Sequence, residues 1–380
     1  MDIKKESSQY LLNTYKKSIC LESGKGCIVY DLEGKGYIDL IGGIATCSVG
    51  HANPAVVKAI SSQANSIINP SNLFYSKPQI QLAKKLVSLS SLDKCFFSNS
   101  GSEAIETAIK LVRKVTKKKQ IVAMKNGFHG RTLGSLSATW TKKYKKSFEP
   151  LIPGFKHADF GDIVSLKKKL GPDTAGVLME PIQGEAGVIV PSPGYLKEVQ
   201  ETCNEYGVLL ILDEIQTGCG RTGKFFCFQH EGLKPDIVTI AKGLANGIPI
   251  GVTLAAKGLD FEPGDHGSTF GGNNLSCTAA LVTISVIEKV MPQVEAKGKK
   301  IMSGLEVMEK VKEVRGKGLM IGAATVGNDY VEKCAVKGLL VNSPHPGVLR
   351  MLPPLTITNK EIDDAILILK QVLNGNGIYD

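Results

Sequence analysis

Short apolar runs alternate with longer amphipathic stretches over roughly residues 95 to 260. Such runs are typical of strands buried on both faces, while apolar residues at every third or fourth position are typical of helices packed on a sheet. The strand-like runs are KCFFS, QIVAM, AGVLME, VLLIL, DIVTIA and GVTLAA, and the helical stretches include EAIETAIKLVRKV and YLKEVQETCNEY. The alternation predicts an α/β fold with a mainly parallel, doubly wound sheet.

The pattern changes after Asn273, where the long helical stretch SCTAALVTISVIEKV is followed by shorter mixed elements. A chain of 380 residues is long enough for one large domain and one smaller one. We therefore expect a large domain over residues 46–275. A smaller α+β domain would be formed by residues 1–45 together with residues 276–380.

Composition narrows the class of protein. Hydrophobic residues make up 43% and charged residues 22% of the chain, as in ordinary globular proteins. The opening MDIKKESSQY has no apolar core of a secretory signal, and no apolar run approaches the roughly 18 residues of a membrane helix. Nine cysteines without a C-x-x-C pair favour reduced thiols, and the six histidines have no metal-binding spacing. We expect a cytoplasmic protein with no membrane contact and no metal site.

The net charge of +10 comes mainly from lysine blocks at residues 113–119, 141–146 and 166–170. Neither a pattern of interleaved aromatic residues nor a recognised nucleic-acid-binding motif accompanies these blocks, so solvated outer faces explain them better. A general attraction for anionic substrates is the alternative. Arginine is rare, because the chain uses lysine for most of its positive charge. The planar guanidinium of arginine can bind a carboxylate through two hydrogen bonds, so the few arginines are candidates for carboxylate sites. The five arginines are Arg113, Arg131, Arg221, Arg315 and Arg350.

Three strand-like runs end in residues that could carry chemistry, and ligands bind at the carboxyl ends of strands in such sheets. KCFFS leads into NSGS, where a helix beginning near Ser102 would offer free N–H groups to a phosphate, although Ser-Gly-Ser is also a good helix cap. VLLIL ends in Asp213. DIVTIA is followed by Lys242, whose pKa burial would lower, leaving an amine that can form a Schiff base unless it extends to solvent.

Together these three features are the parts that a pyridoxal phosphate site requires. The lysine forms an imine with the cofactor, the acid keeps the pyridine nitrogen protonated, and the helix end holds the phosphate. A protonated ring withdraws electrons from the substrate carbon. The sequence therefore predicts pyridoxal phosphate chemistry involving Lys242 and Asp213.

A nicotinamide site is the competing interpretation, because residues 218–223 have the G-x-G-x-x-G spacing behind a strand. In a dinucleotide loop the glycines follow the strand directly and an apolar helix follows them. Here Asp213 and Glu214 come first, and KFFCFQHEGLKPD has no long helical pattern. We expect the glycines to form a tight loop around Arg221 instead.

The motifs resemble those of the class III aminotransferases. They are NSGSEAIETAIKLVR, FHGRT, EPIQGEAGV, LDEIQTGCGRTG, PDIVTIAKGLANGIPIG, HGSTFGGN and VRGKGLMIG, in the family's order from about Asn13 to the C-terminal segment. The resemblance implies a fold-type I homodimer with active sites at the subunit interface and pyridoxal 5'-phosphate as cofactor. It also implies that an amino donor leaves its nitrogen on the cofactor and that 2-oxoglutarate collects it as glutamate.

The resemblance also implies roles for individual residues. Around the cofactor it places Gly101 and Ser102 at the phosphate, Phe128 and Ile215 on the two ring faces, Asp213 at the pyridine nitrogen with Glu214 beside it, Gln216 at the phenolic oxygen, and Lys242 as the Schiff-base lysine. Thr269 would reach the phosphate across the dimer. For substrate it places Arg131 on the α-carboxylate, Ser268 nearby, and Arg350 as a second carboxylate-binding arginine that pairs with Glu185 when no diacid is bound. The sequence departs from the family at GSE, where Gly-Thr-Glu is commoner, and around NSPHPGVLRM.

The amino donor is expected to be N2-acetyl-L-ornithine. Ornithine-specific relatives carry tyrosine where this chain has Ile44, and the tyrosine hydroxyl helps to hold the free α-ammonium. Isoleucine offers that ammonium no partner, whereas an acetylated nitrogen needs none. Ornithine, succinylornithine or another ω-amino acid remain alternatives. An aminomutase, which would typically have methionine in place of Gln216, and a non-catalytic cofactor-binding protein are the rival classes.

Overall fold

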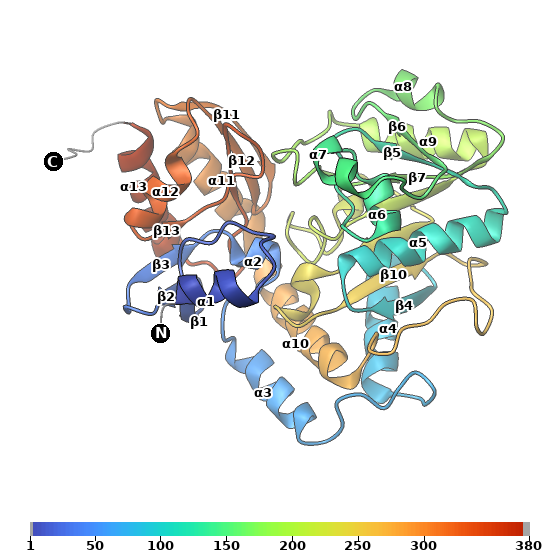
Figure 1. The fold of residues 1–380 in the computed structure, drawn as a ribbon, viewed down its shortest axis with the longest axis horizontal. Helices are drawn as coiled ribbons and strands as arrows, with labels where there is room; N and C mark the ends of the chain where they lie inside the picture. The colour runs from blue at the N-terminus through green and yellow to red at the C-terminus, as the bar shows by residue number, and fades with distance from the viewer. Residues whose placement is uncertain (1–2, 375–380) are drawn as a thin grey trace.

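A seven-stranded sheet forms the centre of the larger part of the molecule (Figure 1), in a computed structural model that describes residues 3–374. The strand order is β4-β10-β9-β8-β7-β5-β6. The pairs β5/β6, β5/β7, β7/β8 and β8/β9 are parallel. The strands are β4 (Lys94–Ser98), β5 (Gln120–Met124), β6 (Phe155–Ala158), β7 (Thr174–Met179), β8 (Leu209–Asp213), β9 (Ile237–Ile240) and β10 (Gly251–Ala255). The predicted α/β fold with a mainly parallel sheet is confirmed.

Two features of this sheet differ from the expectation. β10 runs antiparallel to both β4 and β9, because residues 241–250 contain only the short turn η3 (Lys242–Ala245) and a parallel return needs a longer crossover. The edge strand β6 was not expected, since FKHA lacks a continuous apolar run. An edge strand buries less of its surface, so its sequence carries a weaker pattern.

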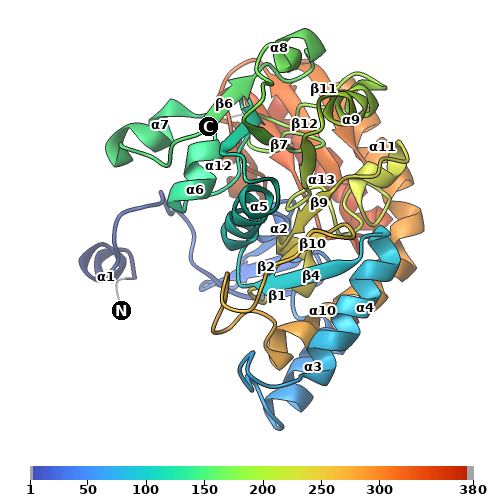
Figure 2. The same cartoon turned by 90° about the vertical axis from the view of Figure 1, so that its right-hand side faces the viewer.

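Helices cover both faces of the sheet (Figure 2). Within β5, Ile121 and Ala123 belong to the core shared with α5, while Val122 and Met124 belong to the core on the opposite face, shared with α9. This alternation is what a strand buried on both sides must show. The helices of this part are α4 (Lys77–Ser90), α5 (Gly101–Thr116), α6 (Leu133–Ala138), α7 (Lys142–Lys145), α8 (Ile163–Lys167) and α9 (Tyr195–Tyr206), with η1 (Lys146–Phe148) and η2 (Cys227–His230).

N-terminal and C-terminal segments of the chain lie together in the smaller part of the molecule (Figure 1). β3 pairs in parallel with β13 in a four-stranded sheet of order β1-β2-β3-β13, and a three-stranded sheet has the order β11-β12-β14. The elements are β1 (Leu21–Lys25), β2 (Ile28–Asp31), β3 (Gly36–Asp39), β11 (Val311–Lys317), β12 (Met320–Thr325), α12 (Tyr330–Val336), β13 (Leu339–Leu340), β14 (Val348–Met351) and α13 (Asn359–Leu373). The domain limits at 45/46 and 275/276 stay a prediction, and residues 1–2 and 375–380 lie outside the described part.

A long helical stretch connects the two parts. It comprises α10 (Asn274–Val290), η4 (Met291–Gln293) and α11 (Val294–Glu306), and by length and composition it could cross a membrane. Pro292 lies in the turn between the two helices, and α10 packs on α3 (Pro54–Ala64) and α4. A core helix of a globular protein has the same apolar composition, and α10 packs against its neighbours as such a core helix. α1 (Ile3–Tyr10) has no buried residue and stands away from the other elements in Figure 2.

Candidate active site

A cavity of about 370 Å³ lies where the strands of the large sheet end. Its lining comes from segments that follow strands of this sheet, from residues 247–250, which precede the reversed strand β10, and from Thr46 near the N-terminal part of the chain. This is the edge at which ligands bind in open α/β sheets, and the volume suits a small organic cofactor. The lining residues named in the sequence analysis are Gly101, Ser102, Phe128, Asp213, Ile215, Gln216 and Lys242.

The start of α5 forms one wall of the cavity. Ser100 caps the helix by accepting a hydrogen bond from Glu103 N at 3.2 Å. The backbone N–H groups of Gly101 and Ser102 have no acceptor within residues 3–374. A Cβ on Gly101 would lie 2.8 Å from Ile215 Cδ1, so a larger residue here would displace the Ile215 side chain. Free N–H groups at the positive end of a helix suit a phosphate.

A buried acid forms the base of the cavity at the end of β8. Asp213 Oδ2 lies 2.7 Å from His129 Nδ1, and its Oδ1 accepts a hydrogen bond from Ile215 N at 3.1 Å. His129 Nε2 is buried and has no hydrogen-bond partner in the described chain. With His129 fixed on one oxygen, the carboxylate is oriented to bind a cationic ring nitrogen.

Sequence reasoning missed two residues of this group. His129 lies inside the quoted FHGRT motif, but nothing in the sequence pairs it with Asp213. Glu180 directly follows β7, just as Asp213 is the last residue of β8. An acid at the end of a buried apolar run is the signal that identified Asp213, and it could have identified Glu180 too. Glu180 accepts hydrogen bonds from Phe128 N at 3.0 Å and Gly184 N at 2.9 Å. Burial raises the pKa of Glu180 to about 7, and Asp213 adds to this while His129 opposes it.

Lys242 lines the same cavity as the acid and lies two residues after the end of β9. Its backbone has φ of 40°, a left-handed conformation that a lysine adopts only at a cost. Within residues 3–374, no hydrogen bond or ion pair engages its amine. Burial lowers the pKa of Lys242, and the Glu185 carboxylate partly opposes this. A lowered pKa leaves more of the neutral amine, which is the nucleophilic form.

A buried arginine adjoins the cavity through Gln216. Arg350 on β14 is only 1% exposed, and its Nη1 donates to Glu185 Oε1 at 2.6 Å, Gly184 O at 3.2 Å and Gln216 Oε1 at 3.2 Å. Burial alone would raise the pKa of Glu185, but Arg350 outweighs it and holds that pKa below its usual range. A buried guanidinium requires such a partner. The Arg350–Glu185 pair is thus present, and its role in binding substrate stays a prediction.

Other expected site residues lie outside the cavity lining. Glu214 is fully buried, with its carboxylate accepting from Cys227 N and Phe228 N, both at 2.7 Å. Both oxygens are therefore used to anchor backbone, and this placement does not support the expected cofactor contact. Ser268 and Thr269 lie in the loop before α10 and line no part of the cavity.

Arg221 is likewise structural in this arrangement. It is buried and donates to the carbonyls of Leu319 at 3.1 Å and Pro353 at 2.5 Å. Glycines 220 and 223 around it have positive φ, as a tight loop requires. The loop therefore holds the two parts of the molecule together through Arg221.

A left-handed turn lies next to the cavity at residues 42–45, the short helix α2 (Gly42–Ala45). All four residues have positive φ, from 55° to 65°. This includes Ile44, and a left-handed conformation costs a side-chain-bearing residue roughly 1–2 kcal/mol. Ile44 is 41% exposed, and Thr46, two residues on, lines the cavity. Strain of this kind is typical of functional segments.

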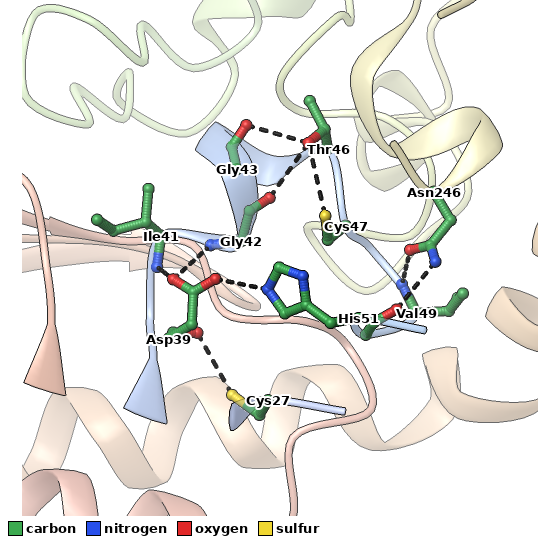
Figure 3. Close-up of polar contacts among 11 residues, drawn as sticks. Cys27, Asp39, Ile41, Gly42, Gly43, Thr46, Cys47, Val49, His51 and Asn246 are labelled. Atoms are coloured by element: carbon green, nitrogen blue, oxygen red, sulfur yellow. Dashed lines mark hydrogen bonds and ion pairs between the residues drawn. The ribbon is translucent and has the colours of Figure 1, made fainter. Parts of the chain in front are cut away.

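Side chains at both ends of the turn keep it in this conformation (Figure 3). Asp39 Oδ1 accepts from Ile41 N at 2.8 Å and Gly42 N at 3.0 Å, and Asp39 Oδ2 lies 2.8 Å from His51 Nε2. The hydrogen bond to Asp39 raises the pKa of His51 to about 10, with a smaller contribution from the nearby Cys47 thiol. Thr46 Oγ1 donates to the carbonyl of Gly43 at 3.1 Å and closes the other end.

These residues fit pyridoxal phosphate. Gly101 and Ser102 would hold its phosphate, Asp213 its ring nitrogen, and Phe128 and Ile215 its ring. Lys242 would bind its aldehyde carbon. The unpaired N–H groups match the phosphate of the cofactor, and the unpaired lysine amine matches its aldehyde. The cavity volume matches the size of its ring.

Comparison with known proteins agrees with this fit. The family model "Aminotransferase class-III" matches residues 11–373. The acetylornithine aminotransferase of Methanopyrus kandleri is 46% identical over 390 residues, covering 99% of this chain and 100% of the relative. That of Methanocaldococcus jannaschii is 47% identical over 383 residues, covering 96% of each.

Solved structures are similar over almost the whole chain. An ornithine aminotransferase from Toxoplasma gondii has a TM-score of 0.94 and 33% identity, covering 98% of this chain and 94% of that one. An acetylornithine aminotransferase from Elizabethkingia anophelis has a TM-score of 0.88 and 33% identity, covering 97% and 98%. The fold, the cavity and the matched motifs agree, and the chain belongs to the pyridoxal phosphate-dependent class III aminotransferases.

Proposed function

We propose that this enzyme transfers the δ-amino group of N2-acetyl-L-ornithine to 2-oxoglutarate, giving N-acetyl-L-glutamate 5-semialdehyde and L-glutamate. The observation that carries the proposal is 43–47% identity, over at least 96% of the chain, to eight proteins named acetylornithine aminotransferase. The reaction belongs to arginine biosynthesis, and we place it in the cytoplasm.

The chemistry divides between the cofactor and the side chains around it. Pyridoxal phosphate, when bound, supplies a carbon that accepts the donor amine and a ring that withdraws electrons. Asp213, oriented by His129, holds a proton on the ring nitrogen. Lys242 Nζ would remove the proton from the donor carbon as general base and deliver it to the cofactor carbon that bears the nitrogen as general acid. Its burial-lowered pKa suits the first of these two roles.

Two arginines would bind the substrate carboxylates. Arg131 binds the α-carboxylate of the donor, which places the distant δ-amine at the reacting carbon. For 2-oxoglutarate, which has two carboxylates, Arg350 leaves Glu185 and binds the second one. The pairing of Arg350 with Glu185 keeps the buried guanidinium neutralised while a monocarboxylate donor is bound.

Donor preference tests this assignment. The kcat/KM for N-acetylornithine should exceed that for ornithine by roughly 10- to 100-fold, because an unpaired ammonium in a partly buried site costs about 1–3 kcal/mol. Ile44→Tyr should narrow the ratio by supplying a hydroxyl to the free ammonium. Steady-state kinetics with 2-oxoglutarate as acceptor measure both values.

Ile44→Phe is the matched control, because it adds the same ring without the hydroxyl. It should leave the preference close to that of the wild type, even if both rates fall together. Ornithine used as well as its acetyl derivative by the wild-type enzyme would show that the donor is wrongly assigned.

We also propose that the active form is a homodimer in which Thr269 of each subunit completes the partner's site. The loop that carries Thr269 is tied to an exposed apolar segment, since Asn69 Nδ2 donates to Thr269 O at 3.1 Å. In that segment Leu73 is 86% and Tyr75 is 98% exposed. Apolar exposure of this extent is typical of a surface that another subunit covers.

A mixed dimer tests where Thr269 acts. Lys242→Ala and Thr269→Glu, the second of which places a negative charge against the phosphate, should each inactivate the homodimer. Co-expressed with different tags and purified as a mixed dimer, the two variants should retain about half of wild-type activity, because one of the two sites contains both intact residues. An inactive mixed dimer, or a fully active monomer in sedimentation, would contradict the proposal.

A further inference from the structure

The guanidinium of Arg131 is stacked against aromatic rings. Its central carbon lies 3.8 Å from the centroid of the Tyr144 ring and 5.5 Å from that of Phe128. The two rings meet edge to face, with centroids 6.1 Å apart and an interplanar angle of 84°. Within residues 3–374 the side chain of Arg131 has no carboxylate partner. The aromatic rings therefore orient the guanidinium, and no carboxylate of the described chain occupies its N–H groups.

Tyr144 owes its position to the anchoring of α7. The neighbouring Lys145 donates to Ser137 O at 3.0 Å and Thr139 O at 2.8 Å, the carbonyls at the end of α6. Burial lowers the pKa of Lys145, as expected for an ammonium used inside the fold. These bonds fix α7 against α6, which begins two residues after Arg131.

The backbone of Arg131 is anchored separately. Its N–H donates to Ser102 Oγ at 3.2 Å, at the start of α5. The main chain is thus fixed to the helix end that lines the cavity, while the tip of the side chain is fixed by a ring from α7. Since an arginine side chain has many rotamers, only the second contact determines where the guanidinium points.

We propose that Tyr144 is a positioning residue that holds the Arg131 guanidinium ready for the substrate carboxylate. A ring stacked on the flat face of a guanidinium leaves the N–H groups at its edge free to bind a carboxylate in bidentate fashion. Holding the side chain in place before substrate arrives removes an ordering cost from binding. The inference rests on the proposed role of Arg131, and it adds a residue from the lysine-rich stretch 141–146.

Binding of glutarate, a dicarboxylate without a reacting carbonyl, tests the inference on the holoenzyme. Calorimetry should give a dissociation constant for Tyr144→Phe within about 2-fold of the wild type, because the ring remains. For Tyr144→Leu the dissociation constant should rise roughly 3- to 30-fold, the range of a partly exposed cation–π contact. The half-reaction with N-acetylornithine should show the same rise in apparent dissociation constant, with a limiting rate within about 3-fold of the wild type.

Two further measurements separate positioning from general damage. Pentylamine has no carboxylate, so its half-reaction should be the same in Tyr144→Leu and the wild type. Trp140, the only tryptophan, packs on His157 with ring centroids 5.2 Å apart, and unchanged emission would show that the segment before α7 is intact. Unaltered glutarate binding in Tyr144→Leu, or equal losses with pentylamine, would overturn the inference. If Arg131→Met also leaves glutarate binding unchanged, the proposed carboxylate site itself is wrong.

Discussion

Lys242→Ala should abolish the covalent link to the cofactor and reduce transamination by about 10²- to 10⁴-fold or more, the range expected from loss of general acid–base catalysis alone. The lysine is the amine at the end of β9 that lines the cavity, and no other group engages it within residues 3–374. The absorbance of the cofactor bound to lysine should disappear. Borohydride reduction of the wild-type enzyme followed by peptide mapping should recover the cofactor on Lys242.

A second buried lysine provides the control. Lys297 is buried and donates to Leu355 O at 3.2 Å, and burial lowers its pKa as it does that of Lys242. It lines no part of the cavity. Lys297→Met should therefore keep the covalent link, and recovery of the reduced cofactor on any lysine other than Lys242 would disprove the assignment.

Asp213→Asn should still bind pyridoxal phosphate but slow the half-reaction with donor by about 10²- to 10³-fold or more. An amide of the same shape can occupy the place beside His129 but cannot stabilise a proton on the ring nitrogen. Without that proton the ring withdraws fewer electrons from the donor carbon, so the proton transfer to Lys242 becomes harder. Stopped-flow absorbance measures the rate, and equilibrium dialysis measures retention of the cofactor.

Asp236→Asn is the matched substitution for this test. Asp236 is partly buried beside the sheet and accepts from Leu210 N at 2.8 Å, but it lies away from the cavity. Its replacement should leave the half-reaction close to the wild-type rate. Turnover at the wild-type rate in Asp213→Asn would remove the proposed role of the acid.

Much of this site could be located from the order of residues alone. Asp213 ends β8 and Lys242 follows β9, as the apolar runs predicted. Gly101 and Ser102 begin α5 at the end of β4. These inferences succeed because parallel strands bring their carboxyl ends to one edge of a sheet, whatever the side chains in between.

Contacts between segments far apart in the chain could not be predicted in this way. The pairing of His129 with Asp213, the hydrogen bonds of Arg350 Nη1 to Gly184, Glu185 and Gln216, and the stacking of Arg131 on Tyr144 each join different elements. The sequence contains all of these residues, but their distances depend on how helices and loops settle on the sheet. Glu214 is the converse case. It is next to Asp213 in the chain, but its carboxylate anchors backbone away from the cavity.

Hydrophobic periodicity by itself establishes the α/β class and the strands that carry the site. Specific motifs along the chain establish the family, and all three depend only on the local order of residues. Tertiary structure decides the reversed direction of β10, the left-handed turn that presents Ile44, and the partners of Asp213, Arg131 and Arg350. Those features depend on packing between segments tens to hundreds of residues apart, and a small change in that packing would alter every distance on which the chemistry relies.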